Sequence, residues 1–295
     1  MRRLRHRTRG FAVCRPLVFV VVLLGSMVCS LQCASSPAQS PANEQADSKT
    51  AADVRQEISV GRALAARLAK RYRIWQDVPA TRYLNLLGQY IAQNSSRSEL
   101  DFHFGILDDD SINAYACPGG YILITRGALA SMQDESELAG VLAHEISHVA
   151  LRHSGQFQDQ SHWIDVLATF LSGGFTVINS SIRTASESLE TELLSRGRSR
   201  AMEFESDQAG ALLASSLGYD PHGQVRYLSR LARNNRAAQG LEDTHPPTAE
   251  RIQQLQLFIR DNQLSGGRRN QSRFQGAMQN VALTQNNATQ LQAQN

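Results

Sequence analysis

Cysteine is scarce in this 295-residue chain, and the positions of the four cysteines exclude a disulfide scaffold. Cys14, Cys29 and Cys33 lie in or beside an N-terminal leader, so Cys117 is alone in the rest of the chain and has no partner for an intramolecular disulfide. Acidic residues are absent before Glu44, whereas six arginines precede it. Without those six charges the formal net charge of +3 becomes −3, which gives no support to nucleic-acid binding.

Long apolar runs are also missing, apart from one short run between Pro16 and Val28. An arginine-rich stretch followed by such a run is typical of a bacterial export signal, and we assign residues 1–33 to a signal peptide. A permanent membrane anchor is the alternative, although the run is short for a membrane span. We therefore expect an exported protein, in the periplasm or on the periplasmic face of the outer membrane.

The end of the leader leaves two possibilities for processing. Cys33 could carry a lipid and attach the protein to a membrane, although Gln32 stands where a lipoprotein leader needs a small residue. Ordinary cleavage near residues 36–38 is the other possibility. The leader itself or a lipid on Cys33 would be the route to any membrane association.

The remaining sequence divides into three parts by composition. Residues 34–50 are rich in Ser, Pro, Ala and Gln and predict a flexible linker. Residues 51–261 carry the periodic apolar pattern of a folded domain, and residues 262–295, rich in Gln and Asn, predict a disordered tail. Within 156–180, apolar pairs predict core packing or a lid over the site, and the pattern does not decide between them.

The folded part predicts an α+β, mainly helical protein with a small sheet. Apolar spacing indicates helices over residues 51–75, after Pro79, and over 185–217. Alternating residues 102–107 predict a strand that carries His103 on its face. Two further β-prone runs, joined by Pro118-Gly-Gly120, predict a hairpin.

The sequence His144-Glu-Ile-Ser-His148 carries the clearest chemistry in the chain. On a helix, the two histidines stand one turn apart on one face, where both imidazoles can bind the same Zn²⁺ ion. Glu145 then lies beside the metal and can take a proton from water that zinc activates. Apart from Ser147, these are the polar side chains of the apolar run 138–151, which favours a metal site over a chance match.

A catalytic zinc usually takes a third protein ligand. Ser154 and Leu151 stand where a metzincin has its third histidine and its glycine, so that class is excluded. His153 falls off the face of the two histidines and is expected to face solvent. A carboxylate from the later helix is the remaining candidate. Glu203 and Asp207 share a face there, so Glu203 can bind the metal while Asp207 accepts a hydrogen bond from a ligand histidine.

Five blocks in order give the chain a resemblance to the HtpX/BepA/LoiP-like zinc metallopeptidases, which include eukaryotic prenyl-protein and inner-mitochondrial-membrane relatives. The resemblance runs from about Ile58 to Ile259. The blocks are Asn113-Ala114-Tyr115-Ala116 with Pro118-Gly-Gly120; Glu137 to His148; Ser199-Arg200, Glu203 and Asp207; Gly218 to Pro221; and His245-Pro246 followed by Arg251-Ile252.

The resemblance implies a zincin-like fold with one Zn²⁺ per chain. It makes His144, His148 and Glu203 the metal ligands and Glu145 the general base. His245 becomes a candidate that either donates to the oxyanion or covers the zinc in a resting state; capping a helix is the alternative. Arg200 is expected to hold Glu203 or Asp207 by a charge-assisted bond.

The resemblance also implies the kind of substrate. The strand Asn113, Ala114, Tyr115 and Ala116 would form the edge of the cleft, where an extended peptide could add as a further strand. Tyr115 could line the cleft or pack in the core. We therefore expect an endopeptidase of the cell envelope that cleaves unfolded or misassembled proteins. A chaperone-like assembly factor with a largely latent site is the alternative, and a zinc hydrolase of other amides is a third possibility.

Overall fold

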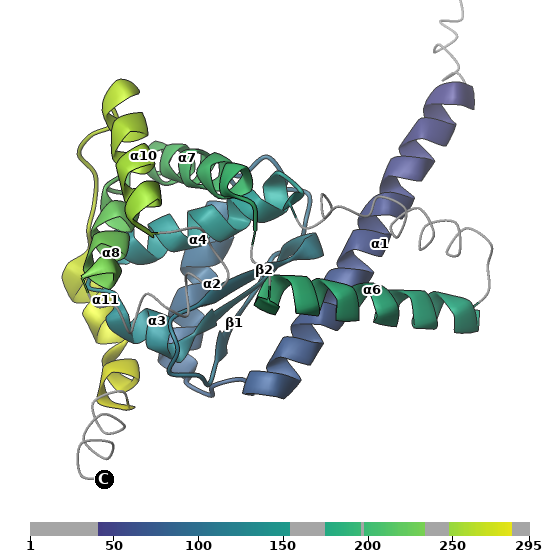
Figure 1. Cartoon of the computed structure of the whole chain (residues 1–295), viewed down its shortest axis with the longest axis horizontal. Coiled ribbons are helices and arrows are strands. Elements are labelled where there is room, and N and C mark those ends of the chain that lie inside the picture. Colours follow the sequence, from purple (N-terminus) through teal and green to yellow (C-terminus); the bar gives the residue numbers. More distant parts are fainter. Residues whose placement is uncertain (1–40, 154–174, 196–197, 234–247, 285–295) are drawn as a thin grey trace, which may run out of the picture. The chain divides into compact units, whose positions relative to one another are not determined.

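The computed structural model describes residues 41–153, 175–195, 198–233 and 248–284, so the leader expected at residues 1–33 lies outside the described part. Helices dominate these residues, and their strands form one three-stranded sheet (Figure 1). The α+β, mainly helical class predicted from the sequence is confirmed. None of the described helices combines the length and the apolar character that a membrane crossing requires.

The first two helices partly correct the sequence prediction. Helix α1 spans Pro41–Tyr72 and α2 spans Val78–Ala92. α1 begins inside residues 34–50, which were expected to be a linker; proline suits the first position of a helix, and Ala, Glu, Gln and Lys follow it. The compact unit described below starts at Gln45, within α1. Asp77 caps α2, because its carboxylate accepts a hydrogen bond from the backbone N–H of Ala80 at 2.8 Å.

The sheet contains the predicted hairpin. Strands β1 (His103–Leu107), β2 (Ala114–Cys117) and β3 (Tyr121–Thr125) lie in the order β1-β3-β2, with β2 antiparallel and β1 parallel to β3. The turn Pro118–Gly120 forms a 3₁₀ helix in which Gly119 has φ 68°, a left-handed conformation that favours glycine. His103 lies on β1, where its ring stacks on Tyr121 with centroids 4.7 Å apart, as expected for a strand-face residue.

The helix with the histidine motif lies at the centre of the core. It is α4, Glu135–Ala150, and follows the short helix α3, Arg126–Ser131. α4 contacts β2, α2, α7 (Arg200–Ser216) and α8 (Gly223–Ala232). At Gly210 of α7 a Cβ atom would lie 2.9 Å from the backbone nitrogen of His144, so glycine allows the two helices to approach closely.

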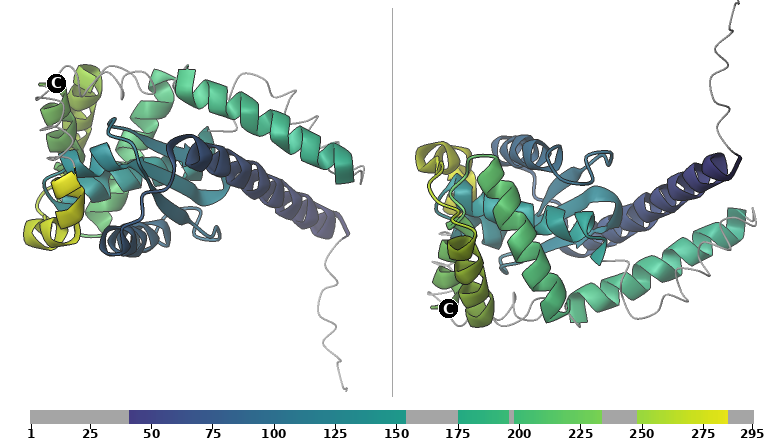
Figure 2. Two further views of the ribbon diagram at one scale, coloured as in Figure 1. Left: turned by 90° about the horizontal axis from the view of Figure 1, so that it is seen from below. Right: turned by 90° about the horizontal axis from the view of Figure 1, so that it is seen from above.

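Two further helices complete the part of the fold around the site. α6 spans Phe175–Ser195, and α10 spans Thr248–Asp261. The single helix predicted over residues 185–217 is therefore wrong: α7 starts anew at Arg200, with Ser199 as its N-cap. α6 runs beside α1 (Figure 2), where Arg67 of α1 pairs with Glu190 of α6 at 2.5 Å. Of residues 156–180, for which core packing or a lid was expected, the structure describes only 175–180, at the start of α6.

Residues 262–284, the C-terminal segment, form ordered structure, which corrects the expectation of a disordered tail for this part of residues 262–295. Helix α11 spans Gln271–Ala277, and Arg268 pairs with Tyr219 in an isolated parallel β-bridge. Phe274, Met278 and Val281 are buried. Composition did not predict the order of this segment, because the segment lacks a dense apolar pattern. Three apolar side chains at helical spacing and several arginines fix it in place.

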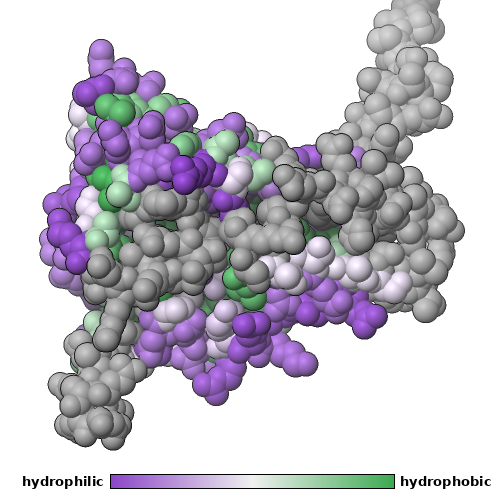
Figure 3. All heavy atoms as spheres, viewed as in Figure 1, coloured by the Kyte–Doolittle hydropathy of each residue, from purple (hydrophilic) through white to green (hydrophobic). Residues whose placement is uncertain are grey.

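Arginines of this segment reach the beginning of α4. Arg269 pairs with the Asp134 carboxylate at 2.6 Å, and Arg273 donates to both oxygens of Glu135. Burial alone would raise the pKa of Glu135, but hydrogen bonds from Arg273 and Tyr83 hold that pKa below its usual range. The helix that carries the motif is thus tied at its start to the C-terminal segment. The described surface is mainly hydrophilic on the face in Figure 3, with hydrophobic residues in small separate groups.

We expect Arg273→Ala to lower the free energy of unfolding at pH 7 by roughly 1–2 kcal/mol, because it leaves a buried carboxylate short of a charged donor and Arg273 itself is partly screened by solvent. Arg260→Ala, which removes an exposed pair with the adjacent Asp261, is the control. Urea denaturation of the variants measures the difference.

The difference in the free energy of unfolding between wild type and Arg273→Ala should depend on pH. The pKa of Glu135 in the folded protein is depressed. Its contribution to the free energy of unfolding is therefore present at pH values above the ordinary glutamate pKa, and it is lost as the pH falls through the folded pKa. The gap between wild type and Arg273→Ala should therefore shrink in acid. A gap that stays constant down to pH 3 would contradict this account.

Candidate metal centre

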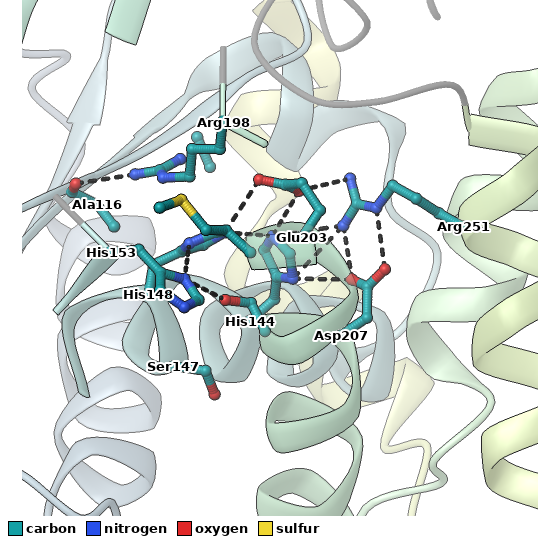
Figure 4. A network of polar contacts seen from close by, with 12 residues as sticks. Ala116, His144, Ser147, His148, His153, Arg198, Glu203, Asp207 and Arg251 are labelled. Carbon is teal, nitrogen blue, oxygen red and sulfur yellow. Dashed lines mark hydrogen bonds and ion pairs between the residues drawn. The ribbon is translucent and has the colours of Figure 1, made fainter. Parts of the chain in front are cut away.

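Helices α4 and α7 bring the three predicted ligands together. His144, His148 and Glu203 offer ligand atoms that all lie within 4.8 Å of one another. The Nε2 atoms of the two histidines are 3.1 Å apart, and the Glu203 carboxylate lies 3.4 Å from Nε2 of His144 and 3.2 Å from Nε2 of His148. Both rings therefore direct Nε2 toward the same point (Figure 4).

This donor set fits a divalent metal ion. Two imidazole nitrogens and one carboxylate are a typical protein ligand set for a catalytic metal that keeps one position for water. All three side chains are buried, with exposures of 3% for His144 and 0% for His148 and Glu203. Burial of such polar groups is costly unless each is partnered, so a shared metal ion explains their arrangement.

Glu145 lies beside these groups in a small cavity. The cavity is lined by Asn113, Ala114, His144 and Arg251, among others. Glu145 is 2% exposed, and its Oε2 atom has no hydrogen-bond partner among the described residues. A buried carboxylate oxygen that faces such a cavity can accept a proton from a water molecule or a substrate there.

A network of charged side chains contacts His144 on the Nδ1 side of its ring. Oδ1 of Asp207 lies 2.8 Å from Nδ1 of His144, the position expected of a carboxylate that supports a ligand histidine. Arg251 of α10 donates to both Asp207 oxygens, at 3.0 and 2.6 Å, and lies 3.3 Å from Glu203. Asp207 also accepts from the Gln224 side chain at 2.7 Å. Such outer contacts fix the tautomer of a ligand histidine and the direction of its ring.

The two histidines differ in charge preference. Burial and Arg251 disfavour a charged His144, but Asp207 and Glu203 outweigh them and raise its pKa to about 9. Burial and Arg198 hold the pKa of His148 well below its usual range. The pair therefore favours one positive charge at neutral pH, on His144. A metal ion held by both Nε2 atoms would have to displace a proton from His144, so metal affinity is expected to fall as the pH is lowered.

Arg200 does not take the predicted role. Its side chain is 66% exposed and lies 3.3 Å from Glu250, a neighbour of Arg251. Arg200 occupies the first position of α7, one turn before Glu203, but its ion pair is with Glu250 of α10. The arginine that holds Glu203 and Asp207 is Arg251, a residue of the last family block for which no role was predicted.

His153 also differs from the expectation. It was expected to face solvent, but it is completely buried, and its Nδ1 atom lies 2.9 Å from Nδ1 of His148. The helical spacing that predicted an exposed side chain no longer applies, because α4 ends at Ala150 and Arg152 has φ 56°. Glu205 is exposed, and one of its oxygens lies 3.2 Å from Nε2 of His153.

The predicted edge strand lies beside the site. Asn113 and Ala114 line the same cavity as Glu145. Tyr115 packs in the core, where its ring stacks on Tyr72 with centroids 6.2 Å apart, so the core alternative is the right one. The Ala116 carbonyl accepts a hydrogen bond from the buried Arg198 at 3.1 Å, a contact between residues 82 positions apart that no local sequence pattern predicts. His245 lies outside the described residues.

We expect Glu203→Ala to lose most of the bound zinc that wild type retains after dialysis, because two histidines alone do not complete a site of this kind. Glu187→Ala, on the half-exposed face of α6, is the matched control. Elemental analysis gives the zinc content per chain. Equal, tightly held zinc in wild type and Glu203→Ala would remove Glu203 from the ligand set.

A second prediction separates Arg251 from Arg200. Arg251→Met should lower the free energy of unfolding by about 3–5 kcal/mol, because it leaves two buried carboxylates without their cation. Arg200→Met removes an exposed ion pair and should change the free energy of unfolding by less than about 0.5 kcal/mol. Urea denaturation measures both. Equal effects of the two substitutions would contradict the network described here.

Comparison with known proteins places this site in context. The model of peptidase family M48 matches residues 80–258. The beta-barrel assembly-enhancing protease of Yersinia pestis is 28% identical over 62% of this chain and 39% of its own length. The protein of that name from Escherichia coli strain K12 is 26% identical over 68% of this chain and 43% of its own length. The mitochondrial metalloendopeptidase OMA1 of Schizosaccharomyces pombe is 28% identical over 63% of this chain and 55% of its own length. The chain thus spans about half or less of these relatives.

Proposed function

The chain belongs to peptidase family M48, and on this premise we propose that it is a zinc-dependent endopeptidase of the bacterial cell envelope. Its substrates in this proposal are unfolded or misassembled envelope proteins. The observation that carries the proposal is the convergence of His144, His148 and Glu203 on one point, with Glu145 beside them on the same helix.

The residues of the site have separate tasks in this proposal. His144, His148 and Glu203 would hold the metal. When bound, zinc supplies a Lewis acid that polarises a carbonyl group and lowers the pKa of water. Glu145 accepts the proton of the attacking water and later passes it to the leaving amine. Asp207 holds the ring of His144 in place.

Arg251 has an electrostatic task in the same proposal. Its guanidinium lies between Glu203 and Asp207, so it offsets the negative charge that two buried carboxylates place beside the ligands. His245 remains the candidate for a donor to the oxyanion or for a residue that covers the zinc. It stands three residues before α10, the helix that carries Arg251.

The position of β2 supports the proposed preference for unfolded chains. A peptide that adds along its edge uses backbone hydrogen bonds, which suits extended segments of varied sequence. Asn113 and Ala114 would guide the peptide past Glu145, since all three residues line one cavity. Farther along, the peptide has to share the Ala116 carbonyl with Arg198 or displace that side chain.

The location in the envelope rests on the leader and on the bacterial relatives. The arginine-rich leader predicts export, and a lipid on Cys33 or the leader itself would give membrane association. The name of the bacterial relatives links them to assembly of β-barrel proteins, which fits an envelope substrate.

The near-complete burial of the site favours a second candidate function. With Glu145 2% exposed and the ligand residues exposed by 3% or less, a substrate reaches them only after the site opens. A chaperone-like assembly factor with a largely latent protease site would also have this arrangement.

One substitution separates the two functions. We expect Glu145→Gln to lower the rate of casein degradation by about 10²–10⁴-fold, because the amide cannot accept the proton, while the bound zinc is retained. Glu187→Gln on α6 should degrade casein at the wild-type rate. Cleavage by Glu145→Gln at the wild-type rate would overturn the proposed mechanism, and intact casein with wild type would favour the assembly factor. N-terminal sequencing of the products checks that peptide bonds are the ones cleaved.

A further inference from the structure

A buried histidine lies directly behind one of the ligand residues. His153 follows the end of α4. Arg152 has a left-handed backbone conformation, which ends the helical course of the chain and allows the His153 ring to pack against His148 of α4. The two Nδ1 atoms of His148 and His153 are 2.9 Å apart, and their rings meet edge to face at an angle of 70°. Figure 4 shows His153 beside His148 in the network around Glu203.

The direction of this hydrogen bond follows from the other end of the His148 ring. Nε2 of His148 faces Glu203 at 3.2 Å and Nε2 of His144 at 3.1 Å, so Nε2 is the atom that would bind the metal. A neutral imidazole that uses Nε2 as a ligand carries its proton on Nδ1. His148 must therefore donate from Nδ1, and Nδ1 of His153 must accept.

The acceptor role in turn places the proton of His153. A neutral ring that accepts at Nδ1 carries its proton on Nε2. Nε2 of His153 lies 3.2 Å from an oxygen of Glu205, which is a suitable acceptor at the surface. The buried Ser206 hydroxyl lies 3.1 Å from Nδ1 of His153 and in this assignment donates to it, sharing the single lone pair of that nitrogen with His148. One assignment of protons thus satisfies every contact of the two rings that is described above.

The opposite assignment of protons to His148 and His153 is incompatible with metal binding by His148. If His153 donated from Nδ1, His148 would have to accept at its own Nδ1 and carry its proton on Nε2. That proton would point at Glu203 and occupy the position of the metal ion. The contacts around His153 therefore select the ligand form of His148.

We propose that His153 is a positioning residue, which holds His148 in the tautomer and ring orientation needed for metal binding, and that Glu205 orients His153. His144 is supported by the Asp207 carboxylate, so the two ligand histidines have different supports. The inference rests on the proposed metal site and does not depend on peptidase activity.

Two substitutions at one position test the proposal in the full-length protein. Asn places an amide oxygen near the position of Nδ1, whereas Leu fills the space without an acceptor. His153→Leu should weaken Zn²⁺ binding about 10–100-fold, measured by competition with a chromophoric chelator. His153→Asn should restore most of the affinity. His103→Leu, on the face of β1, should bind Zn²⁺ like wild type.

Substitution of Co²⁺ for Zn²⁺ gives a spectroscopic test that packing alone would not affect. The visible absorption of the Co²⁺ protein should change in His153→Leu and return toward wild type in His153→Asn. Glu205→Ala should have a smaller effect, because its 63% exposed side chain can be replaced by water. Equal losses of affinity in the Asn and Leu variants would show a packing role and overturn the proposal, as would wild-type affinity in His153→Leu.

The tautomers can also be observed without any substitution, which keeps the test decisive if His153→Leu does not fold. In Zn²⁺-loaded wild type labelled with ¹⁵N-histidine, two-bond nitrogen–proton couplings should show His148 protonated on Nδ1 and His153 on Nε2. The reverse tautomer of His153 would overturn the proposal. A wild type that binds Zn²⁺ with these tautomers but cleaves no casein would contradict the proposed function and leave the role of His153 intact.

Discussion

The ion pairs of Arg251 are the interaction on which the site depends. Three carboxylates, those of Glu145, Glu203 and Asp207, are buried around two histidines in the middle of the core. Uncompensated charges in such a place cost several kcal/mol each, and a single buried guanidinium between Glu203 and Asp207 offsets two of them. Because Arg251 comes from α10, the site is complete only when that helix packs against α7 and α8.

The supports of the two ligand histidines complement this arrangement. Asp207 holds His144 with a charged hydrogen bond, and Arg251 and Gln224 fix Asp207 in turn. His148 is backed by the neutral ring of His153 and lies away from Arg251. The close approach of α4 and α7 at Gly210 keeps both histidines and Glu203 within reach of one ion. Rigid helices, rather than loops, therefore set the geometry of the ligands that the structure describes.

Much of this could be predicted from the sequence because the signals are local. The histidine spacing, the shared face of Glu203 and Asp207, and the Pro118–Gly120 hairpin each depend on neighbours within one element. The misses have a different cause. Arg200 was expected to hold Glu203 or Asp207 and lies near them in sequence, whereas the contact is made by Arg251 from another helix. His153 was misplaced because helical spacing was continued past the end of α4.

The C-terminal segment was missed for a related reason. Its order comes from arginines that reach Asp134 and Glu135, more than 130 positions away in the chain, and composition does not reveal such pairs. Local patterns, together with the family resemblance, thus pointed to the residues that the structure brings together as candidate ligands and base. The groups that hold them in place come from elements brought together only by folding.

The most direct test of the central claim is a crystal structure of the Zn²⁺-loaded protein with anomalous data at the zinc edge. The account predicts one strong peak per chain, about 2.0–2.1 Å from Nε2 of His144 and of His148 and about 2.0–2.2 Å from a Glu203 oxygen. A peak bound by other residues, or no peak at this site in zinc-saturated crystals, would contradict it.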